Sequence, residues 1–286
     1  MRWHSFAQAL ADAGVERPWR ELRLLAEHVT GIPYIDVLLT APCLSDEQWD
    51  VLKTLVERRI KREPLAKILG KASFWTHEFI STQDTLDPRP ESELFVEAVL
   101  ASRPDTSAPM TFLDIGTGTG CLLLSCLSEY TNATGVGVDI SPLALDVAIR
   151  NSAKLGLLPR AHFQLSNWCQ NVDQTFDVIL CNPPYVAEND KVSPNGNLDP
   201  ETLYDPPVAL FAGRDGLAAY REIFATLRKN VYPNGGTHPP STIFVEIGMG
   251  QHDVVCQIAN QYGFVLTRSI FDYQKIPRIL ELNITK

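Results

Sequence analysis

The sequence has no apolar run long enough to cross a membrane, and its basic residues are outnumbered by acidic ones. The longest apolar stretch, around residues 121–124, is interrupted by Ser125 and Ser128, far short of the ~20 apolar residues that a spanning helix needs. Lys and Arg number 25 against 34 Asp and Glu, a formal net charge of −9. These features predict a soluble protein, and they count against a nucleic-acid phosphate backbone as its main partner.

Cysteine and histidine are also sparse, and neither occurs in a metal-binding pattern. The six cysteines include no C-x-x-C pair and the six histidines no H-E-x-x-H motif, so we expect free thiols and no metal. The N-terminal segment lacks a secretory apolar core and contains Asp12 and Glu16, which argue against a transit peptide. We therefore expect this segment to belong to the fold and the protein to be cytoplasmic.

Residues 1–70 have a helical pattern. Ser45-Asp46-Glu47-Gln48 has the form of a capping box, and apolar residues follow at helical spacing as far as Ile60. Similar patterns over residues 6–13 and 19–29 predict a small helical bundle. Basic residues gather toward its end and form either a solvated helix face or a docking surface for an acidic or RNA-bearing partner: Lys53, Arg58, Arg59, Lys61, Arg62, Lys67 and Lys71.

Residues 71–91 are a predicted connector, a short hairpin at 74–79 followed by a Pro-rich turn. Over residues 92–286 helices alternate with short apolar strands, which we predict at 111–115, 135–139, 162–165, 178–181, 242–247, 264–268 and 279–282. Helices are predicted from Ser141 to Gly156, and at 217–229 and 252–262. This alternation predicts an α/β fold with a doubly wound, mostly parallel, seven-stranded sheet, whose ligands bind beyond the carboxyl ends of the strands.

A glycine-rich loop follows the first of these strands: Asp114-Ile115-Gly116-Thr117-Gly118-Thr119-Gly120. Glycines let the backbone approach a ligand closely, and the free N–H groups of the helix that follows point at it. A dinucleotide fingerprint needs a further glycine where Cys121 stands. Alone, the loop fits a dinucleotide or S-adenosylmethionine.

The next two strands end in residues that suit a nucleoside. Asp139 is an acid about 20 residues beyond the loop, where it can accept both hydroxyls of a ribose. The third strand is followed by Asn167 and Trp168, which suit the amino group and the face of an adenine. Each residue also has a plain structural interpretation, Asp139 as a surface acid and Trp168 as a core side chain at the sheet edge.

The fourth strand stops at Cys181-Asn182-Pro183-Pro184-Tyr185. Two consecutive prolines cannot donate to a strand ladder, so the strand must end there. Pro183 and Pro184 fix the backbone so that the Pro183 carbonyl is exposed. The side-chain oxygen of Asn182 and this carbonyl can each accept one N–H of a planar nitrogen group, and Tyr185 offers that group a flat face, but these residues alone do not choose between an amide and an aromatic amine.

These segments carry a family resemblance. D-x-G-x-G-x-G followed by an acid after the next strand resembles the class I S-adenosylmethionine-dependent methyltransferases, and N-P-P-Y resembles their subgroup that methylates conjugated nitrogens. Further segments make nearly the whole chain similar to the HemK-type peptide-chain release factor glutamine methyltransferases: 62–65, 68–70, 74–75, 88–93, 204–210, 213–217, 220–221 and 245–248. The chain departs from the family at Asp87, where an apolar residue is usual, and at Asn167, where an acid is common.

The resemblance implies methylation of the glutamine side-chain nitrogen in the Gly-Gly-Gln motif of class-1 release factors, with residues 1–70 recognising the substrate. It implies that S-adenosylmethionine binds to the glycine loop, Asp139, Asn167, Trp168 and Asn182. Arg89 and Glu93 would close over the methionine end of the cofactor. The segment 186–207, predicted to be a lid or binding loop, would help to hold the release-factor loop, and the substrate amide would bind to residues 182–185.

Three other functions remain open. An adenine-N6 or other exocyclic-amine nucleic-acid methyltransferase would use N-P-P-Y similarly, but the acidic charge and the lack of a separate basic recognition domain count against it. A nicotinamide-dependent oxidoreductase is disfavoured by Cys121 in the glycine pattern and by N-P-P-Y. A non-catalytic, cofactor-binding scaffold that recognises a translation factor is disfavoured by the intact Asn182 and Tyr185.

Overall fold

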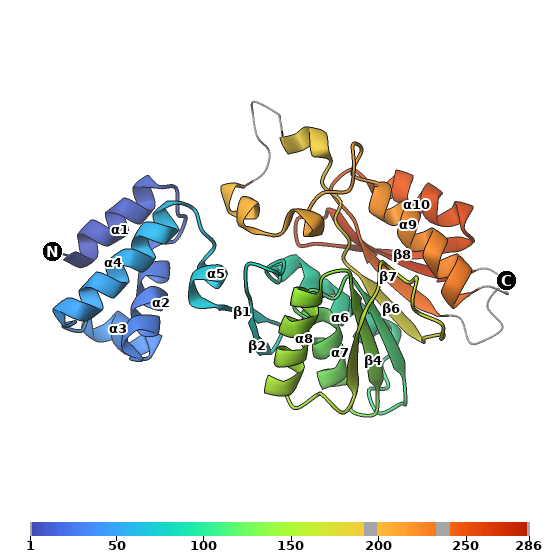
Figure 1. Ribbon diagram of the computed structural model, residues 1–286, viewed down its shortest axis with the longest axis horizontal. Coiled ribbons are helices and arrows are strands. Elements are labelled where there is room, and N and C mark those ends of the chain that lie inside the picture. The colour runs from blue at the N-terminus through green and yellow to red at the C-terminus, as the bar shows by residue number, and fades with distance from the viewer. Residues whose placement is uncertain (1, 192–198, 233–240, 285–286) are drawn as a thin grey trace. The chain divides into compact units, whose positions relative to one another are not determined.

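The computed structural model describes residues 2–191, 199–232 and 241–284. The chain divides into two compact units (Figure 1). One comprises Met1–Lys71 together with Asp199–Tyr204, and the other comprises Ala72–Leu198 and Asp205–Lys286. The short segment 199–204 therefore belongs with the N-terminal unit, although the chain has by then passed through most of the second unit.

The N-terminal unit is a helical bundle, as the sequence predicts. Its helices are α1 (Arg2–Asp12), α2 (Pro18–Thr30), α3 (Tyr34–Thr40), α4 (Asp46–Ile60) and α5 (Leu65–Leu69). Their apolar stripes meet in a core that includes the fully buried Leu22 and Leu52. The capping box at the start of α4 is confirmed, since the Ser45 hydroxyl accepts the Gln48 N–H and the Gln48 side chain accepts the Ser45 N–H. Helices α3 and α5 escaped prediction because they are too short to show a period.

The arginines near the end of this unit are paired with acids inside it. The buried guanidinium of Arg59 has Nε 2.5 Å from Glu21 Oε2 and Nη2 2.7 Å from Glu201 Oε1. Arg62 Nη2 lies 2.8 Å from the same oxygen of Glu201, and Arg58 pairs with Glu63. These three arginines are therefore neither a plain solvated face nor free charge for docking. Arg59 and Arg62 hold the segment 199–204 on the bundle.

The second unit is built on the predicted seven-stranded, mostly parallel sheet. In spatial order its strands are β5 (Ala161–Leu165), β4 (Thr134–Asp139), β3 (Thr111–Ile115), β6 (Val178–Cys181), β7 (Thr242–Glu246), β9 (Pro277–Ile284) and β8 (Phe264–Phe271). Strand β9 is antiparallel to both of its neighbours, and the other pairs are parallel. The order along the chain reverses between β3 and β6, so their carboxyl ends mark the switch point at which α/β proteins bind ligands.

Helices cover both faces of the sheet (Figure 1). Leu180 packs in the cluster formed with α6 (Leu94–Ser102) and α7 (Cys121–Glu129), whereas its neighbour Ile179 packs in the cluster formed with α9 (Ala218–Thr226) and α10 (His252–Gln261). This alternation follows from the two-residue period of a strand. Helix α8 (Pro142–Lys154) begins as predicted at Ser141, whose hydroxyl accepts the Ala144 N–H.

The ends of several elements differ from the predicted ranges. Strands β8 and β9 are longer than predicted because they pair with each other beyond the apolar segments that mark them. Helix α9 ends at Thr226, and a π-helical turn, η5 (Leu227–Val231), follows. The predicted hairpin is present as β1 (Lys71–Phe74) and β2 (His77–Ile80). Short 3₁₀ turns complete the chain: η1 (Pro90–Glu93), η2 (Glu188–Lys191), η3 (Pro200–Tyr204) and η4 (Pro207–Ala209).

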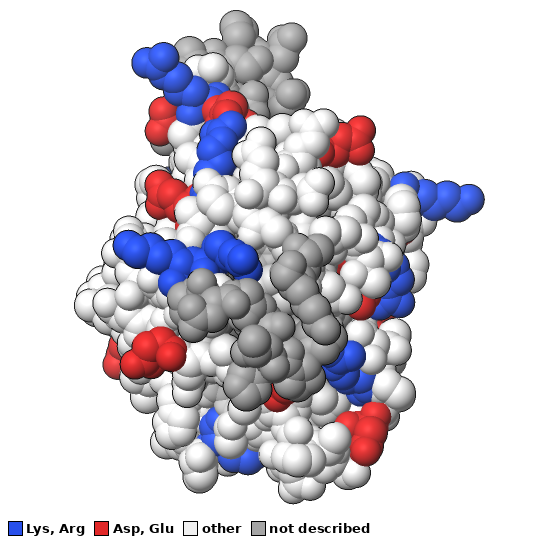
Figure 2. All heavy atoms as spheres, turned by 90° about the vertical axis from the view of Figure 1, so that its right-hand side faces the viewer, with Lys and Arg blue, Asp and Glu red and all other residues white. Residues whose placement is uncertain are grey.

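The surface bears on the possible partners. In the described ranges, no helix has the length and apolar character needed to cross a membrane. On the face shown in Figure 2, the basic and acidic side chains that are coloured are interspersed over a mostly uncharged surface. That face, as far as its residues are described, does not present the continuous basic stripe that a nucleic-acid backbone attracts.

Candidate active site

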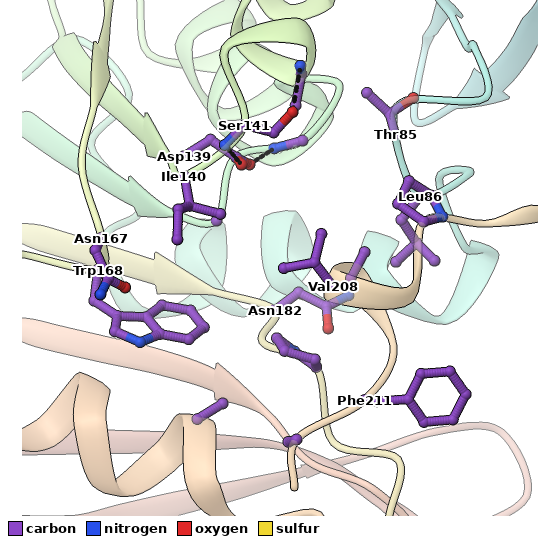
Figure 3. A pocket seen from close by; sticks show the side chains of 18 of the residues that line it. Thr85, Leu86, Asp139, Ile140, Ser141, Asn167, Trp168, Asn182, Val208 and Phe211 are labelled. Atoms are coloured by element: carbon purple, nitrogen blue, oxygen red, sulfur yellow. Dashed lines mark hydrogen bonds between the residues drawn. The ribbon is translucent and has the colours of Figure 1, made fainter. Parts of the chain in front are cut away.

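A cavity of about 250 Å³ lies at the carboxyl ends of β5, β4, β3 and β6 (Figure 3). Its volume is close to the lower end of the range for small-molecule sites. Predicted residues from all four strand ends line it: Gly116, Gly118, Asp139, Asn167, Trp168, Asn182 and Pro184. Parallel strands end on the same edge of a sheet, so these segments meet although they are far apart in the sequence.

Two glycines of the loop after β3 face the cavity. Gly116 has φ 71° and Gly118 has φ 53°, a left-handed conformation that favours glycine. A Cβ added at Gly116 would meet no atom within 4 Å. The backbone here therefore borders open space that a ligand can enter closely.

The other residues of the loop do not line the cavity. The Thr117 hydroxyl donates to Asp114 Oδ2 over 2.6 Å, and both residues are buried. Burial raises the pKa of Asp114 to about 7. Thr119 is buried too, and a Cβ at Gly120 would lie 3.3 Å from Ala148 Cβ. These residues shape the loop from beneath and allow α8 to pack closely against it.

Asp139 is held by the backbone on both of its oxygens. Oδ2 accepts the Gly118 N–H and Oδ1 accepts the Ser141 N–H, each over 2.9 Å (Figure 3). Burial raises the pKa of this carboxyl, and the two N–H donors partly offset the rise. Each oxygen keeps a second lone pair, so the carboxylate can also accept hydroxyl groups from a ligand.

Trp168 extends along one end of the cavity (Figure 3). It has φ 50°, uncommon for a residue other than glycine, and its indole Nε1 donates to Glu222 Oε2 over 2.7 Å. Its ring also packs against the core of the unit. A core position and a place at the cavity are therefore compatible for Trp168, since one side chain both packs against the core and lines the cavity next to Asn167.

Asn182 is connected to a buried carboxylate through one hydroxyl. Its Nδ2 donates to Ser92 Oγ over 3.1 Å, and Ser92 Oγ donates to Glu246 Oε2 over 2.6 Å. The Tyr185 hydroxyl donates to the other oxygen, Oε1, over 3.3 Å. Because Cys181 on β6 is in register with Val245 on β7, the residues that follow them, Asn182 and Glu246, come side by side.

The remaining residues of the N-P-P-Y segment differ in position. Pro184 lines the cavity, whereas Pro183 and Tyr185 are not among its lining residues. Pro183 is buried. The Tyr185 ring packs against the core, and its backbone carbonyl accepts a hydrogen bond from Gln251 Nε2 over 3.0 Å. The phenol therefore supports the segment from behind, in contact with Glu246, where the sequence predicted a flat wall for the substrate.

Arg89 and Glu93 do not line the cavity either. Arg89 Nη2 lies 2.5 Å from Oδ2 of the buried Asp205, and Glu93 accepts the backbone N–H of Trp75 over 2.8 Å and lines a smaller, separate cavity. Both side chains stabilise the conformation of the chain around the connector. The connector reaches the N-P-P-Y segment through a different residue, Ser92.

Sequence reasoning missed a second set of residues at the cavity. Its wall is completed by the connector and by the chain after residue 205, with Asp84, Thr85, Leu86, Pro206, Val208, Ala209 and Phe211. Pro206, Val208 and Ala209 lie in the segment 204–210 that carries part of the family resemblance, whereas the others carry no local signal, because only the tertiary fold brings them there. Glu246 did carry one, since an acid in an otherwise apolar strand must find a buried partner.

Two further predictions concern a lid over the cavity and the absence of a metal site. The predicted lid, 186–207, includes residues 192–198, which lie outside the described residues. In the parts of the chain that are described, no group of three or more His, Cys, Asp or Glu side chains is placed to hold a metal ion.

Comparisons with known proteins extend over both units. Residues 3–70 match the PrmC N-terminal domain, and residues 71–195 match the methyltransferase small domain. The chain is 41% identical over 247 residues to a release factor glutamine methyltransferase of Rhodospirillum rubrum, covering 86% of this chain and 72% of that protein. It is 37% identical over 277 residues to a release factor glutamine methyltransferase of Agrobacterium fabrum, covering 95% and 92%.

A solved structure has the same fold. The hMettl16 catalytic domain in complex with MAT2A 3′UTR hairpin 6 matches with a TM-score of 0.56 over 73% of this chain and 76% of that one. The identity is 14%, so this likeness concerns the arrangement of the sheet and its helices and not the substrate.

Proposed function

The chain belongs to the family of release factor glutamine methyltransferases, and on this premise we propose its reaction and its substrate. It transfers a methyl group from S-adenosylmethionine to the side-chain amide nitrogen of the glutamine in the Gly-Gly-Gln motif of class-1 release factors, in the cytoplasm. One observation carries the proposal. Asn182 lines the cavity with its amide nitrogen bound to Ser92, which leaves its oxygen as an acceptor for an amide N–H.

The residues around the cavity fit the cofactor. Trp168 offers a flat face to an adenine, Asn167 a neutral partner for its amino group, and Asp139 acceptors for the ribose hydroxyls. Gly116 and Gly118 leave room for the ligand to approach the backbone. When bound, S-adenosylmethionine supplies a methyl group on a positively charged sulfur, which is already activated toward a nitrogen nucleophile.

The protein's own task is to orient a poor nucleophile. The lone pair of an amide nitrogen is shared with the carbonyl group, so the amide must be held with its nitrogen toward the methyl group. Asn182 Oδ1 accepts one N–H of the glutamine and the backbone carbonyl of Pro183 accepts the other. The nitrogen gains the methyl group as the bond between that methyl group and the sulfonium sulfur breaks, which leaves neutral S-adenosylhomocysteine. The nitrogen then loses one proton to water, so no strong base is required.

The substrate side of the proposal involves three parts of the chain. Pro184 lies at the cavity and contacts the glutamine side chain, while Tyr185 keeps the segment in place from behind. The helical unit of residues 1–70 recognises the body of the release factor. The segment 186–207 helps to hold the loop that carries Gly-Gly-Gln.

The test is methylation in vitro with purified components. The protein is incubated with a cognate class-1 release factor and labelled S-adenosylmethionine, and the product is mapped by mass spectrometry. We expect one added methyl group, on the Gly-Gly-Gln glutamine, and none on a release factor in which that glutamine is alanine. Label that appears in RNA or DNA instead would overturn the proposal in favour of a nucleic-acid substrate.

A further inference from the structure

Two buried residues that make no contact with substrate in the proposed reaction are connected to Asn182, Ser92 by a direct hydrogen bond and Glu246 through Ser92. We infer that Ser92 and Glu246 are positioning residues, which determine the end of the Asn182 amide that faces the substrate. Ser92 reaches Asn182 from η1, and Glu246 stands at the end of β7. The inference rests on the proposed function and adds to it the residues that prepare the acceptor.

The direction of the hydrogen bonds follows from the carboxylate. An ionised carboxylate only accepts, so the Ser92 hydroxyl, 2.6 Å from Glu246 Oε2, must use its single proton as a donor to it. The Ser92 oxygen can then only accept from the next group, 3.1 Å away, which must be the Asn182 Nδ2. Asn182 Oδ1 is thereby turned away from Ser92. If the side chain were rotated by 180°, two acceptors would face each other.

The surroundings of Glu246 keep its side chain in one place. Glu246 and Ser92 are 4% and 3% exposed, and the second oxygen of Glu246 receives the Tyr185 hydroxyl. The Tyr220 hydroxyl donates to the backbone carbonyl of Glu246 over 3.1 Å. A positioned donor or acceptor must be fixed by neighbours of this kind to be effective, because loose geometry loses much of the rate.

A second buried carboxylate shows what a purely structural acid looks like in the same sheet. Glu281 on the neighbouring strand β9 is 7% exposed, accepts the Ser102 hydroxyl over 3.3 Å and forms an ion pair with Arg268. It does not line the cavity. Glu281 therefore offers a matched control, with similar burial and a serine donor but no connection to Asn182.

The test compares single variants in the release-factor methylation assay. Ser92→Ala removes the acceptor for Asn182 Nδ2. Glu246→Gln introduces an amide that can donate to the Ser92 oxygen, so that the Ser92 hydroxyl can donate to Asn182 and the direction of both hydrogen bonds can reverse. We expect each to lower kcat about tenfold or more. The KM for S-adenosylmethionine and the Kd for S-adenosylhomocysteine should stay within about twofold. Ser92→Thr keeps the hydroxyl and should restore most of kcat.

Controls separate positioning from folding. Glu281→Gln and Ser152→Ala, at a buried serine whose hydroxyl has no hydrogen-bond partner among the described residues, should keep wild-type kcat. The double variant Ser92→Ala with Glu246→Gln should be no more than about threefold slower than either single variant. Loss of either hydrogen bond in the Asn182–Ser92–Glu246 chain already lets the Asn182 amide rotate, so the second loss adds little.

Each outcome bears on one proposal. A Ser92→Ala enzyme with wild-type kcat overturns the inference, and so does a folded Ser92→Thr enzyme as slow as the alanine variant, or an equal loss in the Glu281→Gln control. These results all require that the wild-type protein methylates the release factor. A wild-type protein that does not do so contradicts the proposed function itself. If Glu246→Gln fails to fold, the comparison of Ser92→Ala with Ser92→Thr tests the inference by itself.

Discussion

The two halves of the cavity are held in place by different groups. On the side where we propose that the cofactor binds, both oxygens of Asp139 are fixed by backbone N–H groups, those of Gly118 and Ser141. On the side where we propose that the substrate amide binds, Asn182 is fixed by Ser92, which in turn is held by Glu246. The donors to Asp139 come from its own turn and from the loop after the neighbouring strand β3, whereas Asn182 depends on side chains from more distant parts of the chain.

Each half also contains a buried acid, and the two acids have different neighbours. Asp114 beneath the glycine loop accepts the Thr117 hydroxyl on Oδ2, and its Oδ1 has no hydrogen-bond partner among the described side chains and backbone. Both oxygens of Glu246 receive hydroxyl donors. Burial raises the pKa of Glu246 as well, but the two hydroxyl donors stabilise its ionised form and offset part of that rise. The following variants test this contrast.

Asn182→Ala should have the largest effect. It removes a proposed acceptor for the substrate amide, and we expect kcat to fall by about 10³-fold or more, as when an enzyme loses a preorganised polar contact to the reacting group. Cofactor binding depends mainly on the other half, so the Kd for S-adenosylhomocysteine should change by no more than about threefold. Transfer is measured with labelled cofactor, and folding by thermal unfolding. Full activity in this variant would contradict the two-acceptor arrangement.

Gly216→Ala tests how firmly the N-P-P-Y segment is held by the chain that packs behind it. Gly216 has φ 71°, and a Cβ there would lie 2.4 Å from the backbone carbonyl oxygen of Tyr185, which cannot move without displacing the N-P-P-Y segment. We expect the free energy of unfolding to fall by about 3 kcal/mol and kcat to fall with it. Gly156→Ala is the matched control, with φ 70° and open space around its Cβ, and should cost about 1 kcal/mol.

Urea unfolding and methylation assays on both glycine variants give the comparison. If Gly216→Ala and Gly156→Ala lose the same stability and both keep wild-type kcat, the segment is not as firmly supported from behind as the contacts of Tyr185 indicate.

Asp139→Asn tests the cofactor side. The change weakens acceptance of ribose hydroxyls, and we expect the Kd for S-adenosylhomocysteine to rise about tenfold or more. Because Asp139 also fixes the glycine loop, the same titration is done with an analogue that lacks the 2′-hydroxyl. Binding of that analogue should be weakened much less by the substitution. Equal weakening for both ligands would mean that Asp139 acts only by holding the loop.

The contrast between the two halves also explains what the sequence could predict. Gly116, Asp139 and Trp168 each stand at the end of a strand or within a few residues after it, so a local pattern places them at one edge of the sheet. The contact between Asn182 and Ser92 joins residues that are 90 positions apart in the chain, and no spacing rule gives it. The role of Arg89 and Glu93 at the cofactor was predicted from the family resemblance of their segment, and the structure pairs Arg89 with Asp205 and Glu93 with the backbone of Trp75.

For the fold, too, features with a local sequence pattern were predicted and features that depend on distant contacts were not. Parallel strands surrounded by helices have strong local patterns and were predicted nearly to the residue at β3 and β6. The segment 199–204 was placed with the second unit, because its position in the bundle depends on ion pairs of Arg59 and Arg62 with Glu201. Charged pairs between distant segments leave no periodic trace in a sequence.

The smallest effect is expected from the pH dependence of stability, and it compares the two buried acids directly. Burial raises the pKa of Asp114 from its ordinary value of 3.8 to about 7, so between these values the folded protein binds a proton that the unfolded chain has lost. The stability from this proton is complete below the unfolded pKa and is lost as the pH rises toward and through the folded one. Relative to wild type, Asp114→Asn should therefore gain about 1 to 2 kcal/mol in free energy of unfolding between about pH 5 and about pH 7.

Urea unfolding at several pH values measures this difference, and Glu246→Gln should show a smaller one, because two hydroxyl donors already favour the ionised form of Glu246. Parallel stability curves for wild type and Asp114→Asn would show that Asp114 ionises as easily in the folded protein as in the unfolded chain, and the contrast between the two halves would then lie in the origin of their hydrogen bonds alone.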